Sequence, residues 1–192
     1  VVFGRASGFD ATINLLGLDG SNGFRLDGEA TYDHSGRSVS SAGDVNGDGF
    51  DDVIVGAPDA NYFSGSSYVV FGKASGFDAV MNLSSLDGSN GFRLDGEATY
   101  DLSGSSVSSA GDVNGDGFDD VIIGAHGAPN SNYFGSSYVV FGRASGFDAV
   151  MDLSGLDGSN GFRLDGEAAF DSSGFSVSSA GDVNGDGFDD VI

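Results

Sequence analysis

The stretch "DVNGDGFDD" occupies residues 44–52 and returns unchanged at 112–120 and at 182–190. The copies begin 68 and 70 residues apart. Self-similarity at such a period indicates a repeat architecture, in which each unit is one module that must stack on its neighbours. We therefore predict that residues 1–192 form one repeat region of three units of about 68–70 residues. Both ends are expected to cut within a repeat, because the chain opens on "VVFG" and stops at "DDVI".

The composition favours strands and turns over helices. The chain has 34 glycines, 16 phenylalanines and only 2 prolines, and it has no long stretch with apolar residues at helical spacing. We therefore predict an all-β fold.

The expected strands differ in their patterns. Residues 52–58 and 67–72 are apolar on both faces, as in strands covered on both sides. Residues 38–43 are small, as expected where backbones crowd, whereas residues 23–28 and 9–15 alternate between apolar and polar. This gradient from a crowded inner strand to a half-exposed outer strand predicts the blades of a β-propeller. A sandwich would show one wet face on every strand, and a parallel β-helix has a much shorter repeat.

The net charge of −22 limits the classes of partner. It opposes binding to nucleic acid, whose phosphates would be repelled, and to anionic membranes. No apolar run approaches 18 residues, so we expect no membrane insertion. Cysteine is absent, which excludes disulfides and thiol chemistry.

The repeated stretch has oxygen-bearing residues at loop positions 1, 3, 5 and 9, while position 7 would offer its backbone carbonyl. Gly49 at position 6 permits the sharp turn that aims these oxygens inward. Hard oxygen ligands at alternate positions of a tight loop suit Ca²⁺ better than Mg²⁺. We therefore predict about three Ca²⁺ ions, one per repeat. The candidate ligands are Asp44, Asn46, Asp48, Phe50 and Asp52, then Asp112, Asn114, Asp116, Phe118 and Asp120, then Asp182, Asn184, Asp186, Phe188 and Asp190.

An EF-hand and a turn without an ion are the two alternatives to a calcium-binding hairpin. An EF-hand needs a bidentate Glu at position 12 and flanking helices, but position 12 is Val55 and lies in a strand-like run. An Asx-rich turn without an ion is the simpler alternative, because Asn, Asp and Gly favour turns in any case. Asp51 is expected to be solvated or to stand behind the ligands. If the loops bind an ion, its removal should disorder the hairpins, because the three ligand carboxylates of each loop repel one another at short range.

The combined motifs resemble the FG-GAP repeats of integrin α-subunit heads and their bacterial relatives. A "GAP" follows the metal loop at 56–58 and a modified "GAHGAP" stands at 124–129, while "SGRSV" at 35–39 precedes the inner strand in place of a Phe-Gly element. The long insert at 74–98 looks more like the bacterial members. The resemblance implies a seven-bladed propeller that holds calcium in the hairpin loops of several blades and serves in extracellular or cell-surface adhesion.

These observations predict a calcium-binding structural or adhesive module of an extracellular or cell-surface bacterial protein. Its ligand is unidentified, and further repeats of the same chain or a second copy are expected as partners. No enzyme is expected, because the acids repeat three times whereas an active site usually appears once, and no G-x-S-x-G elbow occurs. Two alternatives stay open: a self-assembling extracellular fibre subunit, and a non-catalytic propeller scaffold of a secreted hydrolase.

One further pattern recurs outside the loops. Arg25, Arg93 and Arg163 stand in "FRLDGE" beside acidic residues, and we expect structural ion pairs there.

Overall fold

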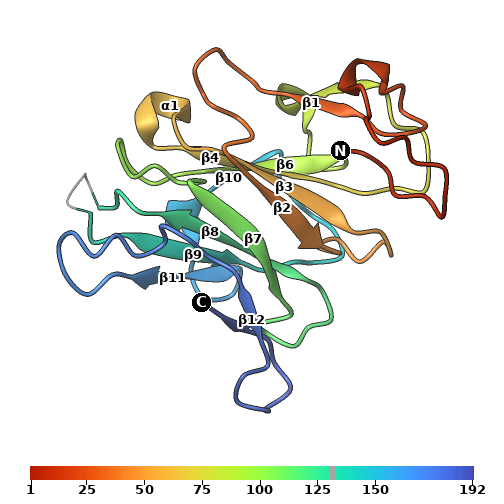
Figure 1. The fold of residues 1–192 in the computed structure, drawn as a ribbon. Helices are drawn as coiled ribbons and strands as arrows, with labels where there is room; N and C mark the ends of the chain where they lie inside the picture. Colours follow the sequence, from red (N-terminus) through yellow and green to blue (C-terminus); the bar gives the residue numbers. More distant parts are fainter. Residues whose placement is uncertain (130–132) are drawn as a thin grey trace.

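The computed structural model describes residues 1–129 and 133–192 (Figure 1). The elements are almost all strands, so the all-β prediction is confirmed. In chain order they are η1 (Leu15–Gly17), β1 (Arg25–Asp27), β2 (Ser38–Gly43), β3 (Asp52–Ala57), α1 (Ala60–Phe63), β4 (Ser66–Val70), β5 (Val80–Asn82), η2 (Leu83–Ser85), β6 (Gly91–Asp95), β7 (Ser106–Gly111), β8 (Asp120–Ala125), β9 (Ser136–Val140), β10 (Val150–Asp152), η3 (Leu153–Gly155), β11 (Gly161–Asp165), β12 (Ser179–Gly181) and β13 (Asp190–Val191). The segment α1 is a single irregular turn, because Asn61 and Tyr62 have left-handed backbone angles.

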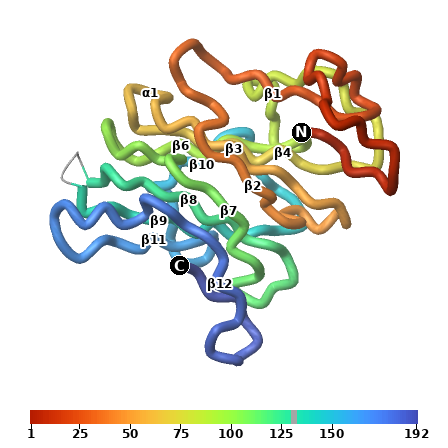
Figure 2. Tube along the Cα trace, viewed as in Figure 1, coloured from red at the N-terminus to blue at the C-terminus, as the bar shows by residue number. Residues whose placement is uncertain are grey.

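Two antiparallel meanders form the body of the molecule. From the inner to the outer strand, one meander has the order β2-β3-β4-β6 and the other has the order β7-β8-β9-β11. In both, the order in space is also the order along the chain. The two sheets stack on each other, with β2 beside β7, as the chain trace in Figure 2 shows. Parts of two further units flank them: Val2 bridges Gly23 before β1, and β12 pairs with β13 near the C-terminus. This is the arrangement of propeller blades.

The burial of the strands follows the predicted gradient. Every residue of β8 and β9 is buried, and β3 and β4 are buried almost throughout. In the outer strand β6, Phe92 and Leu94 are fully buried while Arg93 and Asp95 are half-buried. The middle strands are therefore covered on both faces and the outer strand on one, as the sequence predicts.

Two of the outer strands, β1 and β6, pair with a strand from the following repeat. β10 pairs in parallel with β6, with Met151 opposite Leu94, and β5 pairs in parallel with β1 in the same way. The expected strand at 9–15 is wrong, since those residues form no strand. Its counterparts become strands only by pairing with the outer strand of the preceding unit, and residues 9–15 have no such neighbour within the described chain.

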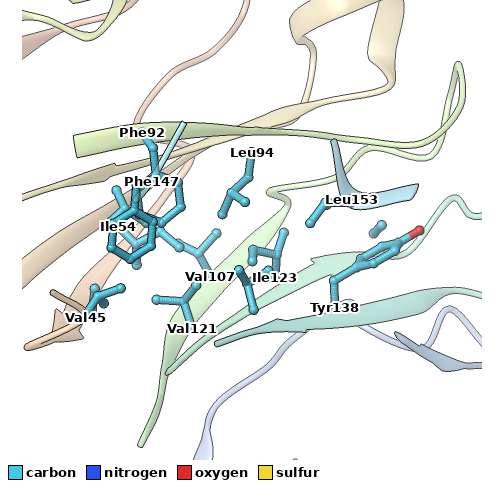
Figure 3. Packing of buried hydrophobic residues seen from close by; sticks show 14 of the residues in the cluster. Val45, Ile54, Phe92, Leu94, Val107, Val121, Ile123, Tyr138, Phe147 and Leu153 are labelled. Atoms are coloured by element: carbon cyan, nitrogen blue, oxygen red, sulfur yellow. The ribbon is translucent and has the colours of Figure 1, made fainter. Parts of the chain in front are cut away.

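The main hydrophobic core lies between the two sheets (Figure 3). Ile54, Phe92 and Leu94 of the first blade face Val121 and Ile123 of the second, and all five are at most 1% exposed. Burial of this kind contributes roughly 25 cal/mol per Å² of apolar surface. Stacking of the blades, rather than either sheet alone, therefore creates the core.

Phenylalanines of the long inserts pack against aromatic rings of the preceding blade. Phe147, carried by the insert that precedes β10, stacks on Phe92 with ring centroids 4.6 Å apart and planes 9° apart, and its edge meets Phe71 at 5.4 Å. Phe77 stacks on Phe24 with the same spacing and angle one repeat earlier. Offset aromatic pairs of this geometry contribute about 0.5–1.5 kcal/mol beyond their burial.

Backbones come very close at the inner strands. A Cβ atom added to Gly56 would lie 2.1 Å from the carbonyl oxygen of Gly104 in the next repeat, and one added to Gly124 would lie 1.9 Å from that of Gly174. The hydroxyl of Ser38 donates a hydrogen bond to the same Gly104 oxygen at 2.8 Å. The glycine of the "GAP" motif is therefore required for contact between blades. The close approach lies at Gly56 of β3, opposite Ser38 of the inner strand for which crowding was expected.

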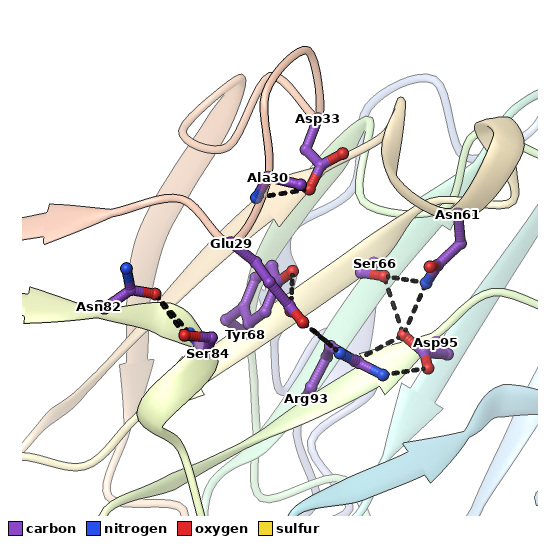
Figure 4. A network of polar contacts seen from close by, with 10 residues as sticks. All are labelled: Glu29, Ala30, Asp33, Asn61, Ser66, Tyr68, Asn82, Ser84, Arg93 and Asp95. Atoms are coloured by element: carbon purple, nitrogen blue, oxygen red, sulfur yellow. Dashed lines mark hydrogen bonds and ion pairs between the residues drawn. The ribbon is translucent and has the colours of Figure 1, made fainter.

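A polar network joins the outer strands of adjacent repeats (Figure 4). Arg93 Nη1 donates to Glu29 at 2.9 Å and its Nη2 to Asp95 at 3.0 Å, while the Tyr68 hydroxyl donates to Glu29 at 3.1 Å. Arg163 makes the equivalent pairs one repeat later, with Glu97 and Asp165. The predicted ion pairs are confirmed, including that of Arg25 with Asp27. Those of Arg93 and Arg163 each gain a glutamate from the preceding repeat.

Candidate cation-binding loops

The repeated acidic stretch connects the two inner strands of each blade. Residues 44–52 turn between β2 and β3, whose antiparallel register shifts between Ser41 and Gly43. Gly43 takes a φ of +75°, which only glycine adopts freely, and the chain enters the loop there. The predicted hairpin is confirmed, and the flanking strands exclude an EF-hand, which needs helices.

Three predicted ligand side chains converge at the head of the loop. The backbone N–H of Asp48 donates to Asp44 Oδ1 at 3.0 Å and to Asn46 Oδ1 at 2.9 Å. The N–H of Gly49 donates to Asp44 Oδ2 at 2.9 Å, and Asn46 Nδ2 lies 3.2 Å from Asp48 Oδ2. The three backbone bonds recur in the other two loops, where they join Asp112, Asn114 and Asp116, and then Asp182, Asn184 and Asp186. The side-chain bond recurs in the second loop, between Asn114 and Asp116.

The acid at position 9 lies deeper. Asp52 is 1% exposed and accepts hydrogen bonds from the N–H groups of Val45 at 3.0 Å and Gly72 at 2.7 Å. Asp120 is fully buried with the equivalent pair of bonds. In the third loop, Asp190 keeps the bond from Val183 N–H at 2.8 Å. The acid at this position therefore ties the loop to its base.

The electrostatics of position 9 are unfavourable without a positive charge. Burial, with smaller contributions from the carboxylates of Asp48 and Asp44, raises the pKa of Asp52 to about 7, although two backbone N–H groups act to lower it. The pKa of Asp120 is raised to about 7 by the same causes. A bound cation would lower these pKa values instead, because it favours the charged form of every carboxylate around it.

The residue at position 7 contributes a backbone hydrogen bond to the side chain at position 5. The N–H of Phe50 donates to Asp48 Oδ1 at 2.9 Å, and those of Phe118 and Phe188 make the same bond to Asp116 and Asp186. These bonds turn position 5 toward the loop interior. The predicted ligands at positions 1, 3, 5 and 7 are thus linked by hydrogen bonds within the loop.

The donor set fits Ca²⁺. Carboxylates and amide oxygens are the ligands that Ca²⁺ takes, and a carboxylate oxygen that accepts one N–H bond retains further acceptor capacity. Within residues 1–129 and 133–192, however, no three His, Cys, Asp or Glu side chains are already grouped as metal ligands. The loop geometry is also that of an Asx-rich turn, so calcium binding stays a prediction.

The sequence analysis missed one contact of these loops. Asp51 is exposed, as expected, but its counterparts Asp119 and Asp189 accept backbone hydrogen bonds from the loop of the preceding repeat. The pattern within one repeat carries no signal for this contact, because the partner lies 75 or 77 residues away.

Comparison with known proteins matches these features to one family. Residues 35–70 and 103–140, which run from just before the inner strand to the end of the third strand of each complete blade, match the FG-GAP repeat. The chain carries FG-GAP repeats and is integrin-like in sequence. It is 33% identical to integrin alpha-4 of Xenopus laevis over 171 residues, covering 88% of this chain, and 32% identical to integrin alpha pat-2 of Caenorhabditis elegans over 164 residues, covering 82%.

A third relative is named as an enzyme and not as an integrin. The FG-GAP chain is 31% identical over 140 residues, or 64% of its length, to the phosphatidylinositol-glycan-specific phospholipase D of Dictyostelium discoideum. The matched region spans only 15%, 13% and 14% of the three relatives. FG-GAP repeats form propeller blades, so the two complete sheets are blades of a larger propeller. No helix in the described residues is long and apolar enough to cross a bilayer.

Proposed function

We propose that this chain is a calcium-stabilised propeller segment with a structural or adhesive role in an extracellular or cell-surface protein. The observation that carries the proposal is the loop between the inner strands of each repeat, where three oxygen-bearing side chains converge near a further aspartate that is buried in the first two loops. Similarity to integrin α-subunits supports the adhesive and extracellular parts of the proposal. The bacterial origin rests on the long insert alone and stays a prediction.

Calcium would neutralise the charge that each loop concentrates. In the first loop Asp44, Asn46, Asp48 and Asp52 would hold the ion with the Phe50 carbonyl, and the other two loops would use the equivalent residues. Three divalent ions add six positive charges to a net charge of −22, which leaves −16. Because the loop joins the two inner strands, loss of the ion would weaken the centre of the blade.

Calcium titration and melting test this proposal together. We expect the chain to bind about three ions by isothermal titration calorimetry and to melt at a higher temperature in millimolar calcium than in EGTA. Asp48→Asn should remove one binding event, whereas Asp10→Asn, which changes the charge equally at an exposed position, should remove none. Equal melting temperatures in calcium and EGTA, with no heat of binding, would refute calcium binding.

The partners follow from the architecture and the charge. We infer that further repeats, from the same chain or a second copy, stack against the flanking units, and that a protein or other surface ligand binds the assembled propeller. The charge of −22 argues against nucleic acid. Sedimentation of the pure chain distinguishes a small closed assembly, which gives one defined species, from a fibre subunit, which gives a mass that grows with concentration.

A second candidate function has one specific observation in its favour. The similarity to a phospholipase D supports a role as the non-catalytic propeller of a hydrolase. In that case a catalytic domain would be encoded beside these repeats, and the isolated repeats would show no hydrolysis of a phosphatidylinositol glycan. A parent sequence made of repeats alone would count against this alternative.

A further inference from the structure

In the second and third loops, the acid at position 8, which has no predicted ligand role, hydrogen-bonds to the loop of the preceding repeat. Asp119 Oδ2 accepts a hydrogen bond from the N–H of Asp44 at 2.8 Å, and the N–H of Asp119 donates to the carbonyl of Asp44 at 3.2 Å. Asp189 makes the same two bonds with Asp112, at 3.0 and 3.1 Å. The first ligand residue of one loop is therefore held on both backbone groups by the next loop.

The ring at position 7 reinforces this contact. A Cβ atom added to Gly47 would lie 2.3 Å from the Phe118 ring, and one added to Gly115 would lie 2.3 Å from the Phe188 ring. Gly185, in the third loop, has nothing within 4 Å of the same point. All three glycines have a φ between +72° and +77°. They thus share a backbone conformation and differ only in whether a following loop covers them.

The position of Asp119 in its own loop links the two sites. It lies between Phe118, whose carbonyl is a proposed ligand, and Asp120, whose carboxylate is another. A cation held by residues 112–120 would fix the backbone on both sides of Asp119. The fixed Asp119 would then orient Asp44, the first ligand of the preceding loop, and bring a further negative charge close to it.

We propose that Asp119 and Asp189 are positioning residues that couple each calcium loop to the loop before it, so that calcium binding in successive loops is positively cooperative. The inference rests on the proposed calcium binding and adds a residue outside the ligand set. Coupling of this kind is reciprocal, so occupancy of either loop favours the other. Loss of one such hydrogen bond to a charged group corresponds to about a tenfold change in affinity.

Three matched variants of the 192-residue chain test the coupling. Asp119→Ala, Asp189→Ala and Asp51→Ala remove the same residue from the same loop position, but Asp51 is exposed and bonds to no preceding loop in the described structure. In calorimetric titrations with calcium chloride, we expect Asp119→Ala and Asp189→Ala each to weaken one site about tenfold and to reduce cooperativity. Asp51→Ala should bind calcium as the unmodified chain does.

A second series guards against variants that fail to fold. Gly47→Ala and Gly115→Ala force the ring of the next loop away, whereas Gly185→Ala introduces the same backbone strain without a ring to displace. We expect the first two to lose more of the calcium-induced rise in melting temperature than the third. A purely structural role would instead lower the melting temperature equally in calcium and in EGTA.

Hydrogen exchange in the unmodified chain gives an independent measurement. In calcium, the amides of Asp44 and Asp112, which donate to Asp119 and Asp189, should exchange more slowly than that of Asp182, to which no other loop bonds within the described residues. Calcium binding that is the same in Asp119→Ala, Asp189→Ala and Asp51→Ala would overturn the coupling while leaving the calcium sites intact. Absence of any calcium binding by the unmodified chain would overturn both.

Discussion

Replacing Phe147 with alanine tests whether the inserts hold neighbouring blades together. Phe147 is 9% exposed, stacks on Phe92 at 4.6 Å and meets the edge of Phe71 at 5.4 Å. Truncation of a buried phenylalanine typically costs about 3–5 kcal/mol. Because Phe147 stands on an insert that can partly collapse into the gap, we expect a loss near the lower limit, about 3 kcal/mol.

The chain provides its own control for this substitution. Phe9 occupies the same place in the first repeat, is 52% exposed and contacts only the guanidinium of Arg5 among the described aromatic and cationic groups. Phe9→Ala should therefore cost about 0.5 kcal/mol. For a chain of this length, 1 kcal/mol shifts the melting temperature by about 2–4 °C, so Phe147→Ala should melt about 6–12 °C lower.

Thermal melting followed by circular dichroism, in calcium and in EGTA, measures both variants. The loss should appear in both buffers, because the rings that Phe147 contacts, those of Phe92 and Phe71, are not predicted calcium ligands. If Phe147→Ala and Phe9→Ala melt within about 2 °C of each other, the insert does not fasten the blades and the reasoning is wrong.

Two further outcomes follow from the same geometry. In EGTA, the free energy of unfolding should fall as pH rises from about 4 to 7. Asp52 and Asp120 each have a pKa near 7 in the folded protein, above the value in the unfolded chain, so deprotonation favours unfolding. Each residue should contribute a loss of up to about 1.4 kcal/mol per pH unit. In calcium the slope should reverse, since the ion binds the charged form; denaturant titrations at several pH values check the sign. Gly56→Ala should cost about 1–3 kcal/mol, because its Cβ meets a carbonyl oxygen of the next blade, whereas Gly4→Ala, with open space around it, should cost little; equal urea midpoints for the two would contradict the close approach.

The sequence was most informative about features contained within one repeat. The hairpin at 44–52 and the covered middle strands at 52–58 and 67–72 follow from local composition, because turn chemistry and the period of apolar residues act over a few positions. The convergence of Asp44, Asn46 and Asp48 belongs to the same class. Repetition then supplied the architecture, since one unit cannot bury its own core.

Contacts between repeats were beyond this reasoning. The failed strand at 9–15 and the unforeseen role of Asp119 have the same origin, because each depends on a neighbour about one repeat away. The pairing of β10 with β6 is likewise invisible in the pattern of residues 150–152, which gives no indication that their partner lies in another blade. Repeated sequence shows that units stack, but it does not show which side chains cross the boundary.

The strand that each repeat lends to its predecessor has a consequence for biosynthesis. The blade that ends at Asp95 acquires its outermost strand only when Asp152 has been made, 57 residues later. At a translation rate of about 5–20 residues per second, that interval is about 3–11 seconds. Throughout it, the outer edge of β6 leaves the ribosome uncovered and open to pairing with other nascent chains, so a chaperone that shields strand edges would act on this protein during synthesis rather than after it.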